Sequence, residues 1–388
     1  MNKPKLLIVT TIDMTFNYIL KGQPKFLNNF FSITVGSSNY QGIKNFAKDE
    51  SVEFIHIPMY RRINPIYDIF SILSLIRDLL RIKPDIIHSY TPKAGLICAI
   101  SAFIVGTPKR LHTFTGLIFP NQKFLLRKIL SSTDNLICRL NTHIIAEGEG
   151  VKRQLIDAGI ASKNINIIGN GNIAGVDTHY FNRRHPNLLG RVNLIRKQLL
   201  FTSNTITFSY VGRINEQKGI LELLKAFEML SNEEIKLILV GDFEKHDRFS
   251  KRIKKYYSSP QNNIFWVGWH SDIRPYLAVS DCFILPSYRE GFPNVLLQAG
   301  AMKLPSIVTD VPGSNEIIQD GYNGWIIPSK DSYSILVKLK NVITLPKLEL
   351  EKFGQNAQNN IKEKYEKSDY QETLVKFYQS LQIDKKNI

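Results

Sequence analysis

The amino-acid sequence predicts an α/β protein with two doubly wound, Rossmann-like parallel sheets that face a cleft. Short, β-branched apolar runs alternate with longer amphipathic segments, which is the pattern of parallel strands connected by helices. The alternation breaks once, in a polar and basic stretch at residues 182–199, and then restarts. At 388 residues the chain is also long for a single hydrophobic core, so two domains of about 150–200 residues are expected.

The first half begins with LLIVTT at residues 6–11, an apolar run that is expected to be the first strand. The segment IYDIFSILSLIRDLLRI at residues 66–82 has helical periodicity. The stretch AGLICAISAFIVG at residues 94–106 is too short to span a bilayer and is interpreted as a packed helix. Further strands are expected at residues 31–38, 52–57, 85–90, 109–114, 142–147 and 164–170.

The second half shows the same alternation, and its strands are expected at residues 206–212, 236–241, 264–268, 282–287, 306–310 and 324–328. We therefore predict an N-terminal domain over residues 1–188, which would bind the acceptor, and a C-terminal domain over residues 189–388, which would bind the donor. The last helix, about 365–388, is a candidate to pack back on the N-terminal domain. A ligand is expected between the sheets, at the carboxyl ends of their strands.

The charge balance restricts the classes of partner. A formal net charge of +16 suits nucleic acid, an anionic membrane surface or phosphorylated small molecules. The sequence has no aromatic–basic stacking motif, zinc knuckle or basic tail, so nucleic acid is not expected as a partner.

The cysteines and the N-terminus indicate the compartment. Cys98, Cys138 and Cys282 are far apart and each lies in an apolar run, which predicts buried free thiols in a reducing compartment. The N-terminal MNKPKLLIVTT has one short apolar run followed by polar residues, which is not the pattern of a signal peptide. A cytoplasmic protein is therefore expected.

The loop that follows the first strand of the second half is suited to phosphate. In YVGRINEQKGI, residues 210–220, Gly212 allows a sharp turn at the strand end, and Arg213 and Lys218 can project beyond it. Two cations beside a helix N-terminus favour a phosphate or diphosphate. The alternative is an ordinary solvated loop, because Arg and Lys usually lie on surfaces.

The segment EGFPNVLLQAG at residues 290–300 follows another apolar run. Glu290 stands at the strand end, where its carboxylate can accept hydrogen bonds from sugar hydroxyls, although a lone Glu there is more often a helix-dipole partner. Pro293 suits the first turn of a helix, and Asn294 would then present a free amide to the same cleft. The helix carries Gln298 further along, toward the same ligand.

Taken together, these segments resemble glycosyltransferase family 4, whose members are retaining enzymes of the GT-B fold that use nucleotide sugars. VGRINEQKG resembles the family's phosphate-binding loop, and WVGWHSDI its nucleobase-facing loop. PSYREGFPNVLLQAGAMKLPSIVTDVPGSNEII resembles its donor-sugar and ribose segment. HSYTPKAG and LHTFTG resemble a subgroup that builds bacterial surface polysaccharides. The resemblance covers nearly the whole chain.

The resemblance implies roles for individual residues. Arg213 and Lys218 would neutralise the donor diphosphate as it leaves, and Glu290 would hold hydroxyls of the donor sugar; these three form the expected catalytic set. Position 298 would meet the nucleotide ribose. The implied substrate-binding residues are Gly212, Gly291, Phe292, Pro293, Asn294, Gln298, Trp269, Thr115, His112 and Thr11.

The sequence departs from the family pattern at three places. Where the family usually has a second glutamate, this chain has Gln298, whose amide oxygen is a weaker acceptor than a carboxylate. The loop after the first strand has no glycine before Gly22. Many members have a histidine after the strand at 109–114, but the nearest position here is Thr115, and His112 on an apolar strand is more often a satisfied core residue.

No metal and no cofactor are expected. No two aspartates stand two residues apart, so a DxD site is missing, and the eight histidines show no metal-ligand spacing. The basic pair is expected to stabilise the charge on the leaving diphosphate instead. NQKFLLRKIL at residues 121–130 mixes Phe and Leu with Lys and Arg, as an interfacial helix would, but it equally fits an amphipathic helix packed on the core.

The sequence therefore predicts a cytoplasmic transferase, peripheral at the anionic inner face of the cell membrane. By the resemblance it would move a sugar, with retention, from a nucleotide sugar, expected to be UDP-linked, to a lipid-linked saccharide in capsule, O-antigen or exopolysaccharide synthesis. One alternative is a nucleotide-sugar epimerase, which would need cleft carboxylates and histidines beyond Glu290. The other is a catalytically degenerate transferase that serves as a binding subunit, which only Gln298 favours.

Overall fold

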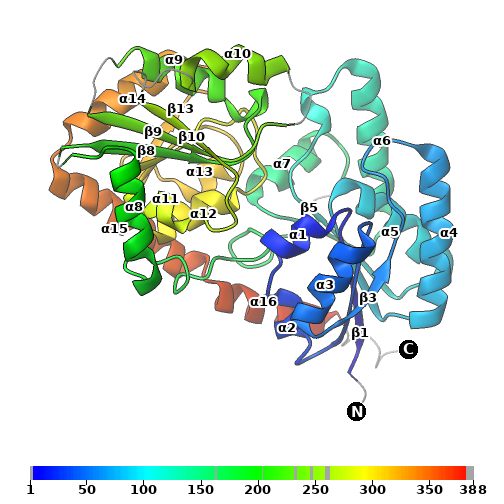
Figure 1. Ribbon diagram of the computed structural model, residues 1–388. Coiled ribbons are helices and arrows are strands. Elements are labelled where there is room, and N and C mark those ends of the chain that lie inside the picture. Colours follow the sequence, from blue (N-terminus) through cyan, green and yellow to red (C-terminus); the bar gives the residue numbers. More distant parts are fainter. Residues whose placement is uncertain are drawn as a thin grey trace. The chain divides into compact units, whose positions relative to one another are not determined.

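The computed structural model describes residues 3–161, 164–202, 204–230, 234–244, 248–257 and 263–381. The chain divides into two compact units, each with its own parallel sheet covered by helices on both faces (Figure 1). The first unit comprises the chain up to Ala174 together with the chain from Ser368 on, and the second comprises Gly175–Lys367. The predicted fold class, two doubly wound parallel-sheet domains, is confirmed.

The described part of the first unit contains a seven-stranded sheet in the order β3-β2-β1-β4-β5-β6-β7, and every adjacent pair is parallel. The strands are β1 (Lys5–Val9), β2 (Ser32–Ser37), β3 (Glu53–His56), β4 (Ile86–Tyr90), β5 (Lys109–Phe114), β6 (His143–Ala146) and β7 (Ile165–Asn166). The predicted strand at residues 164–170 is thus only two residues long. The chain order reverses between β1 and β4.

Alternate residues of β1 enter different cores, which explains why its sequence is apolar throughout. Leu6 and Ile8 pack with residues of α1, α2, α3 and α16, whereas Leu7 and Val9 pack with residues of α4 and α5. The helices are α1 (Asp13–Tyr18), α2 (Gln23–Leu27), α3 (Tyr40–Glu50), α4 (Pro65–Ile82), α5 (Pro92–Val105), α6 (Phe124–Leu140), α7 (Glu149–Asp157) and α16 (Lys367–Ser380). The predicted helix at 66–82 is α4, and that at 94–106 is α5, which packs against α4 and α6 but leaves Phe103 and Ile104 exposed near its end.

The second unit has a six-stranded sheet in its described residues, in the order β10-β9-β8-β11-β12-β13. All adjacent pairs are again parallel, and the order reverses between β8 and β11. The strands are β8 (Ile206–Val211), β9 (Ile235–Val240), β10 (Ile264–Gly268), β11 (Cys282–Leu285), β12 (Ser306–Thr309) and β13 (Gly324–Ile327).

Helices cover both faces of the second sheet. Figure 1 shows α9 and α10 over one face and α11 and α12 over the other. The helices are α8 (Leu189–Gln198), α9 (Ile220–Glu228), α10 (Arg248–Tyr257), α11 (Arg274–Val279), α12 (Asn294–Ala301), α13 (Ser314–Ile317), α14 (Ser332–Thr344) and α15 (Lys347–Lys364), and a 3₁₀ turn, η3, spans Glu216–Lys218. One continuous core of buried Leu, Ile, Val and Phe side chains joins these layers.

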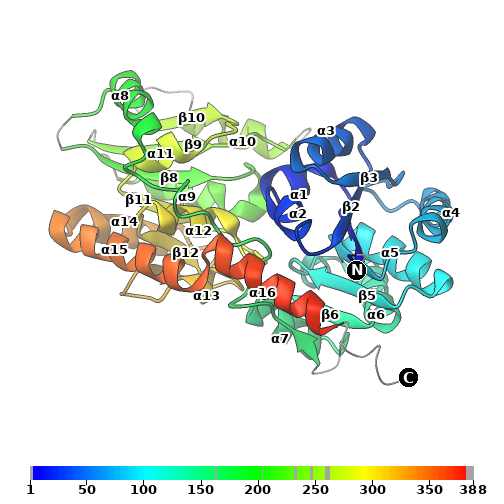
Figure 2. The same cartoon turned by 90° about the horizontal axis from the view of Figure 1, so that it is seen from below.

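The units divide after Ala174, earlier than the predicted boundary at 188/189. The physical reason is packing: Val176 and Leu188 are buried in the core of the second unit, so the segment before α8 belongs there. At the other end, Leu374 and Tyr378 of α16 are buried in the core of the first unit. Figure 2 shows α16, in red, with the elements of that unit.

All three cysteines are free thiols. Cys98 and Cys282 are buried as expected, but Cys138 on α6 is only half-buried. Burial raises the pKa of the Cys138 thiol to about 12, and the Asp134 carboxylate adds to that shift. The prediction of three buried thiols is therefore wrong for Cys138.

Candidate active site

The expected catalytic residues follow β8 and β11, the two central strands of the second sheet. These strands are neighbours, but the next strand after each lies on opposite sides: β9 beside β8, and β12 beside β11. At such a switch point the two loops diverge and leave a crevice at the carboxyl ends of the strands. Arg213 and Lys218 lie in the first loop and Glu290 lies in the second.

The loop after β8 is held by its own hydrogen bonds. Gly212 has φ 153°, and a Cβ there would lie 2.7 Å from the hydroxyl of Tyr210. That hydroxyl donates to the carbonyl oxygen of Arg213 at 2.8 Å. The side-chain oxygen of Asn215 accepts from the backbone N–H of Lys218 at 3.1 Å and so caps η3. Gly212 thus permits a turn that a side chain would obstruct.

The loops after β8 and β11 lie against each other. Gly219 has φ 66°, and a Cβ there would be 1.9 Å from the carbonyl oxygen of Pro286, so the backbones approach too closely for any other residue. The backbone N–H of Tyr288 donates to the carbonyl of Gln217 at 2.8 Å. These contacts bring Lys218 and Glu290 together although they are 72 residues apart.

Lys218 and Glu290 form the central ion pair of the site. The Lys218 Nζ lies 2.5 Å from the Glu290 Oε1, and their side chains are 21% and 10% exposed. The hydroxyl of Ser287 donates to the same carboxylate oxygen at 2.6 Å. The carboxylate is therefore fixed by two donors in a mostly buried position, where such bonds are stronger than on the surface.

Two further charged residues that the sequence interpretation missed belong to this cluster. Glu244, after β9, lies 3.5 Å from Arg213 and also accepts from the side-chain amide of Asn215 at 2.9 Å. Arg289 adjoins Glu290: burial lowers the pKa of the Arg289 guanidinium, the Glu290 charge opposes this, and Arg213 adds to it. Arg289 could have been recognised from the sequence, because it immediately precedes Glu290. Three cations thus gather around the switch point.

The segment after Glu290 turns into α12 at Asn294, and Pro293 is the residue immediately before this helix. The Phe292 side chain packs in the core of the second unit. It is 4% exposed and its ring lies 5.5 Å from that of Tyr365, centroid to centroid. The ring therefore anchors the loop in the core, and substrate binding by Phe292 stays a prediction. The backbone of Gly291 is in turn packed so closely by Gly313 that a Cβ at Gly313 would lie 2.1 Å from the Gly291 carbonyl oxygen.

Gln298 and Trp269 both stay accessible at the carboxyl side of this sheet. Gln298 lies on α12 and is half-buried, and its side-chain amide has no hydrogen bond to any described residue. Trp269 follows β10 and is 50% exposed. Its neighbour Trp266 donates its indole N–H to the carbonyl of Gly241 at 2.7 Å, which ties the ends of β9 and β10 together.

In the first unit, Thr11 lies at the corresponding switch point, between β1 and β4. Its hydroxyl is 2.6 Å from that of Thr91, which follows β4, and it accepts from the backbone N–H of Ala94 at 3.2 Å. Thr91 has φ 75°, an uncommon conformation for a β-branched residue. Strained backbone of this kind concentrates at functional sites. Thr11 therefore stabilises the strained start of α5.

His112 is a core residue. It is 1% exposed, its Nδ1 lies 2.9 Å from the Ser89 hydroxyl, and Gly95 leaves room for the ring, since a Cβ there would be 2.4 Å from the imidazole. Burial lowers the pKa of His112 to about 3, although a hydrogen bond with the backbone of Ser89 opposes this shift. The predicted substrate contact of His112 is not supported, because the ring is enclosed. Thr115, just after β5, is half-buried.

The arrangement can bind an anion and orient hydroxyl groups. Arg213, Lys218 and Arg289 supply positive charge at the carboxyl-terminal edge of the second sheet. Glu290 supplies a hydrogen-bond acceptor within the same cluster. Among the described residues, no three His, Cys, Asp or Glu side chains are grouped so that they could hold a metal ion. In the same part of the chain, no helix is both long and apolar enough to cross a membrane.

Two family models match the chain, one on each half. "Glycosyltransferase Family 4" matches residues 31–172, and "Glycosyl transferases group 1" matches residues 192–360. The second match contains the whole Arg213–Lys218–Glu290 cluster.

Curated relatives and solved structures agree with these matches. The capsular polysaccharide biosynthesis glycosyltransferase CapM of Staphylococcus aureus is 29% identical over 383 residues, which is 97% of each chain. The UDP-Gal:alpha-D-GlcNAc-diphosphoundecaprenol alpha-1,3-galactosyltransferase of Escherichia coli is 28% identical over 81% of this chain and 80% of its own. The crystal structure of HepE of Anabaena in complex with UDP superposes with a TM-score of 0.80 at 18% identity, covering 97% of this chain and 100% of HepE.

Proposed function

We propose that this chain, which belongs to glycosyltransferase family 4 and has the GT-B fold, moves a sugar with retention from a UDP-sugar to a lipid-linked saccharide. One observation carries the proposal. The loops after β8 and β11 bring Arg213, Lys218, Arg289 and Glu290 together at the switch point of the second sheet. This is the charge pattern that a sugar bound to a diphosphate needs.

The two ion pairs of the site suggest how the donor binds. Arg213 and Lys218 are each matched with a carboxylate, Glu244 and Glu290 respectively. A diphosphate offers both cations a doubly charged partner with more acceptor oxygens. When it binds, Lys218 turns to the phosphate and Glu290 becomes available to accept from hydroxyls of the sugar. As the bond to the sugar breaks, charge builds on the phosphate and the cations stabilise it more strongly.

Retention follows from front-face attack in this proposal. The leaving phosphate oxygen takes the proton from the acceptor hydroxyl while that hydroxyl forms the new bond to the anomeric carbon. Glu290, held by Lys218 and Ser287, orients the sugar and is not the base. Because protein cations already face the diphosphate, we expect that a divalent metal is not required, and chelation with EDTA should leave transfer nearly unchanged.

The choice of donor and acceptor is supported by the relatives. HepE was crystallised with UDP, and the E. coli relative is named for a UDP-sugar donor and a diphosphoundecaprenol-linked acceptor. CapM is named for capsular polysaccharide biosynthesis and covers nearly the same length as this chain. We accordingly propose a lipid diphosphate-linked saccharide as acceptor and surface polysaccharide synthesis as the process. The acceptor would be bound by the first unit, near Thr11 and Thr91.

The surface of α4 and α6 supports a peripheral position at an anionic membrane. Ile66, Ile69, Phe70 and Leu73 on α4 are exposed, and so are Phe124 and Leu125 at the start of α6. Both helices pack against α5. Exposed cations adjoin these side chains, namely Arg61, Arg62, Lys123, Arg127 and Lys128. Apolar side chains interleaved with Lys and Arg are typical of an interfacial helix, and a lipid-linked acceptor would be presented at such a surface.

The experiment is a transfer assay with purified protein, a panel of UDP-sugars and a lipid-linked acceptor. Transfer with the active donor should fall at least a hundredfold in Arg213→Ala and in Lys218→Ala, because each substitution removes a charge-assisted bond to phosphate worth roughly 1.5–3 kcal/mol, and more as the leaving group forms. Lys225→Ala on α9 removes an exposed lysine and should retain wild-type transfer.

Two outcomes would contradict the proposal. Interconversion of the UDP-sugar without transfer would identify an epimerase. Binding of UDP-sugars without turnover of any donor in the panel would identify a binding subunit.

A further inference from the structure

A groove lies at the other edge of the second sheet, away from the site described above. Asp281 immediately precedes β11 and Pro305 immediately precedes β12, so both mark the amino-terminal edge. The groove has a volume of about 1030 Å³, which is large enough for a small-molecule ligand. It is formed by the segment before α8, α8 itself, the loop that follows α12, and α15.

The charge of this groove is strongly positive. Its lining includes seven Lys or Arg residues and three Asp or Glu residues. A concave surface with one dominant sign of charge focuses its electric field and attracts ions of the opposite sign. The net charge of +16 is thus partly concentrated in a hollow.

The floor of the groove is held by hydrogen bonds to the backbone. The Nε of Arg183 donates to the carbonyl of Ala278 at 2.9 Å, and one terminal nitrogen donates to that of Ser280 at 2.5 Å, which fixes the guanidinium against the end of α11. One oxygen of Asp281 accepts from the backbone N–H of Thr207 at 2.8 Å. These groups have structural partners and form the base on which other cations are placed.

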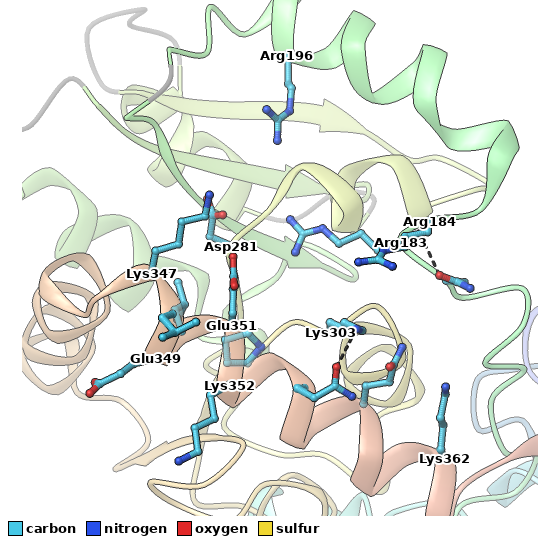
Figure 3. A pocket seen from close by; sticks show the side chains of 16 residues that line it. Arg183, Arg184, Arg196, Asp281, Lys303, Lys347, Glu349, Glu351, Lys352 and Lys362 are labelled. Carbon is cyan, nitrogen blue, oxygen red and sulfur yellow. Dashed lines mark hydrogen bonds between the residues drawn. The ribbon is translucent and has the colours of Figure 1, made fainter.

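Two cations converge above this floor from opposite sides. Figure 3 shows Arg196 extending from α8 and Lys347 from α15 toward Asp281, whereas Glu349 and Lys352 point away. Burial raises the pKa of Asp281, and Arg183, Arg196 and Lys347 all oppose that shift, so the three cations act on one carboxylate. In the described part of the chain, neither Arg196 nor Lys347 has an ion pair or a hydrogen bond through its side chain.

We propose that this groove binds a multivalent phosphate anion through Arg196 and Lys347. Seven cations line the groove against three carboxylates, and of these Asp281 and Glu351 act on Arg183, so positive charge remains in excess. A planar guanidinium opposite an ammonium matches the oxygens of a phosphate or diphosphate. The site is separate from the donor site, because β8 has six residues and separates the two edges of the sheet by roughly 20 Å. The proposal does not depend on the donor assignment.

The experiment uses the full chain and inorganic pyrophosphate as the probe, measured by calorimetry at low salt. The test variant is Arg196→Ala combined with Lys347→Ala; both residues are exposed, and unchanged thermal unfolding will show that the fold persists. Arg213→Ala with Lys218→Ala removes the donor-site cations. Lys225→Ala with Lys340→Ala removes the same charge from exposed positions on α9 and α14.

The wild-type chain should bind pyrophosphate at two sites. The groove variant should lose one of them, with affinity at least tenfold weaker there, while the donor-site variant keeps it and the charge-matched control keeps both. Unchanged two-site binding in the groove variant would overturn the proposal, and so would a single wild-type site that disappears in the donor-site variant.

A second arm separates the two sources of such phosphate. Sedimentation with phosphatidylglycerol vesicles is compared between the wild type and the groove variant. If the groove variant loses pyrophosphate binding and still sediments with vesicles, the ligand is a soluble phosphate compound. If the groove variant loses both pyrophosphate binding and sedimentation with vesicles, the ligand is a lipid phosphate. If the groove variant binds pyrophosphate and sediments with vesicles as the wild type does, the groove is not a phosphate site.

Discussion

At the scale of single residues, the two cations of the site differ in the carboxylate with which each forms an ion pair. Lys218 shares one oxygen of Glu290 with the Ser287 hydroxyl, whereas Arg213 and Glu244 pair at a surface position where both side chains are about half exposed. Exposed pairs of this kind contribute at most about 1 kcal/mol, but a mostly buried pair is sensitive to loss of one partner. Substitution of Glu290 therefore affects Lys218 as well.

Glu290→Gln should separate catalysis from nucleotide binding. The amide keeps the shape but removes the charge that holds Lys218, so the lysine turns more readily to phosphate. We expect the transfer rate to fall at least a hundredfold while the affinity for UDP stays equal or rises. Kinetics of transfer and calorimetry with UDP check this. Equal loss of UDP and UDP-sugar affinity would mean that Glu290 contacts the nucleotide and not the sugar.

Substitutions of Gln298 test whether this residue contacts the ribose of the donor. Gln298→Leu should leave a ribose hydroxyl without an acceptor and raise the Michaelis constant of the donor more than it lowers turnover. Gln298→Glu supplies a stronger acceptor but places a carboxylate near the diphosphate, and we expect activity within about tenfold of wild type. Steady-state kinetics of both variants with the donor show whether Gln298 contacts the ribose. Wild-type kinetics in Gln298→Leu would leave this side chain with a packing role alone.

At the scale of elements, a buried polar network joins α16 to the first sheet. His88 on β4 lies 2.6 Å from the Tyr378 hydroxyl through Nδ1 and 2.7 Å from the Thr113 hydroxyl through Nε2. His88 is fully buried, and burial lowers its pKa to about 3, with His112 adding to the shift. Both imidazoles are therefore neutral in the folded protein at neutral pH.

Stability should fall as the pH drops below the ordinary histidine pKa. Between pH 6.5 and about 3 the unfolded chain binds protons that folded His88 and His112 do not, so the free energy of unfolding decreases by up to about 1.4 kcal/mol per histidine for each pH unit. Thermal unfolding at pH 7 and pH 5 measures this. His88→Gln should reduce the pH dependence, whereas His179→Gln, at an exposed position, should not. An unchanged pH dependence in His88→Gln would exclude His88 as a source.

At the scale of the whole molecule, charge and exposed apolar area act together. In the proposed membrane docking, the net charge of +16 would attract the chain to anionic surfaces in general, while the apolar residues of α4 and α6 would hold one particular face there. Attraction by charge weakens as salt shortens the Debye length, but insertion of apolar side chains does not.

Binding to anionic vesicles should therefore have two separable parts. Phe124→Ser with Leu125→Ser should weaken sedimentation at both low and high salt, and Arg61→Ser with Arg62→Ser should weaken it at low salt only. Leu189→Ser with Tyr333→Ser, two exposed apolar positions of the second unit, is the matched control and should sediment as the wild type does. Equal binding of all variants, or binding independent of salt, would contradict membrane docking through this surface.

Much of the fold could be predicted because its signals are local. Leu6, Leu7, Ile8 and Val9 are consecutive and apolar because the strand is covered on both faces, and this pattern can be recognised without knowing its neighbours. The positions of Arg213, Lys218 and Glu290 are local in the same sense, since each follows a recognisable apolar strand.

What the sequence by itself determined is thus the series of strands and helices, the family, and the loops that carry the charged residues. Only the tertiary structure decided that Phe292 and His112 are enclosed, that Glu244 meets Arg213, and that Arg196 and Lys347 converge on one groove. The physical reason is that these outcomes depend on the order of strands in each sheet and on side-chain packing between segments far apart in the chain. Periodicity reports which face of an element is buried, but not what lies against it.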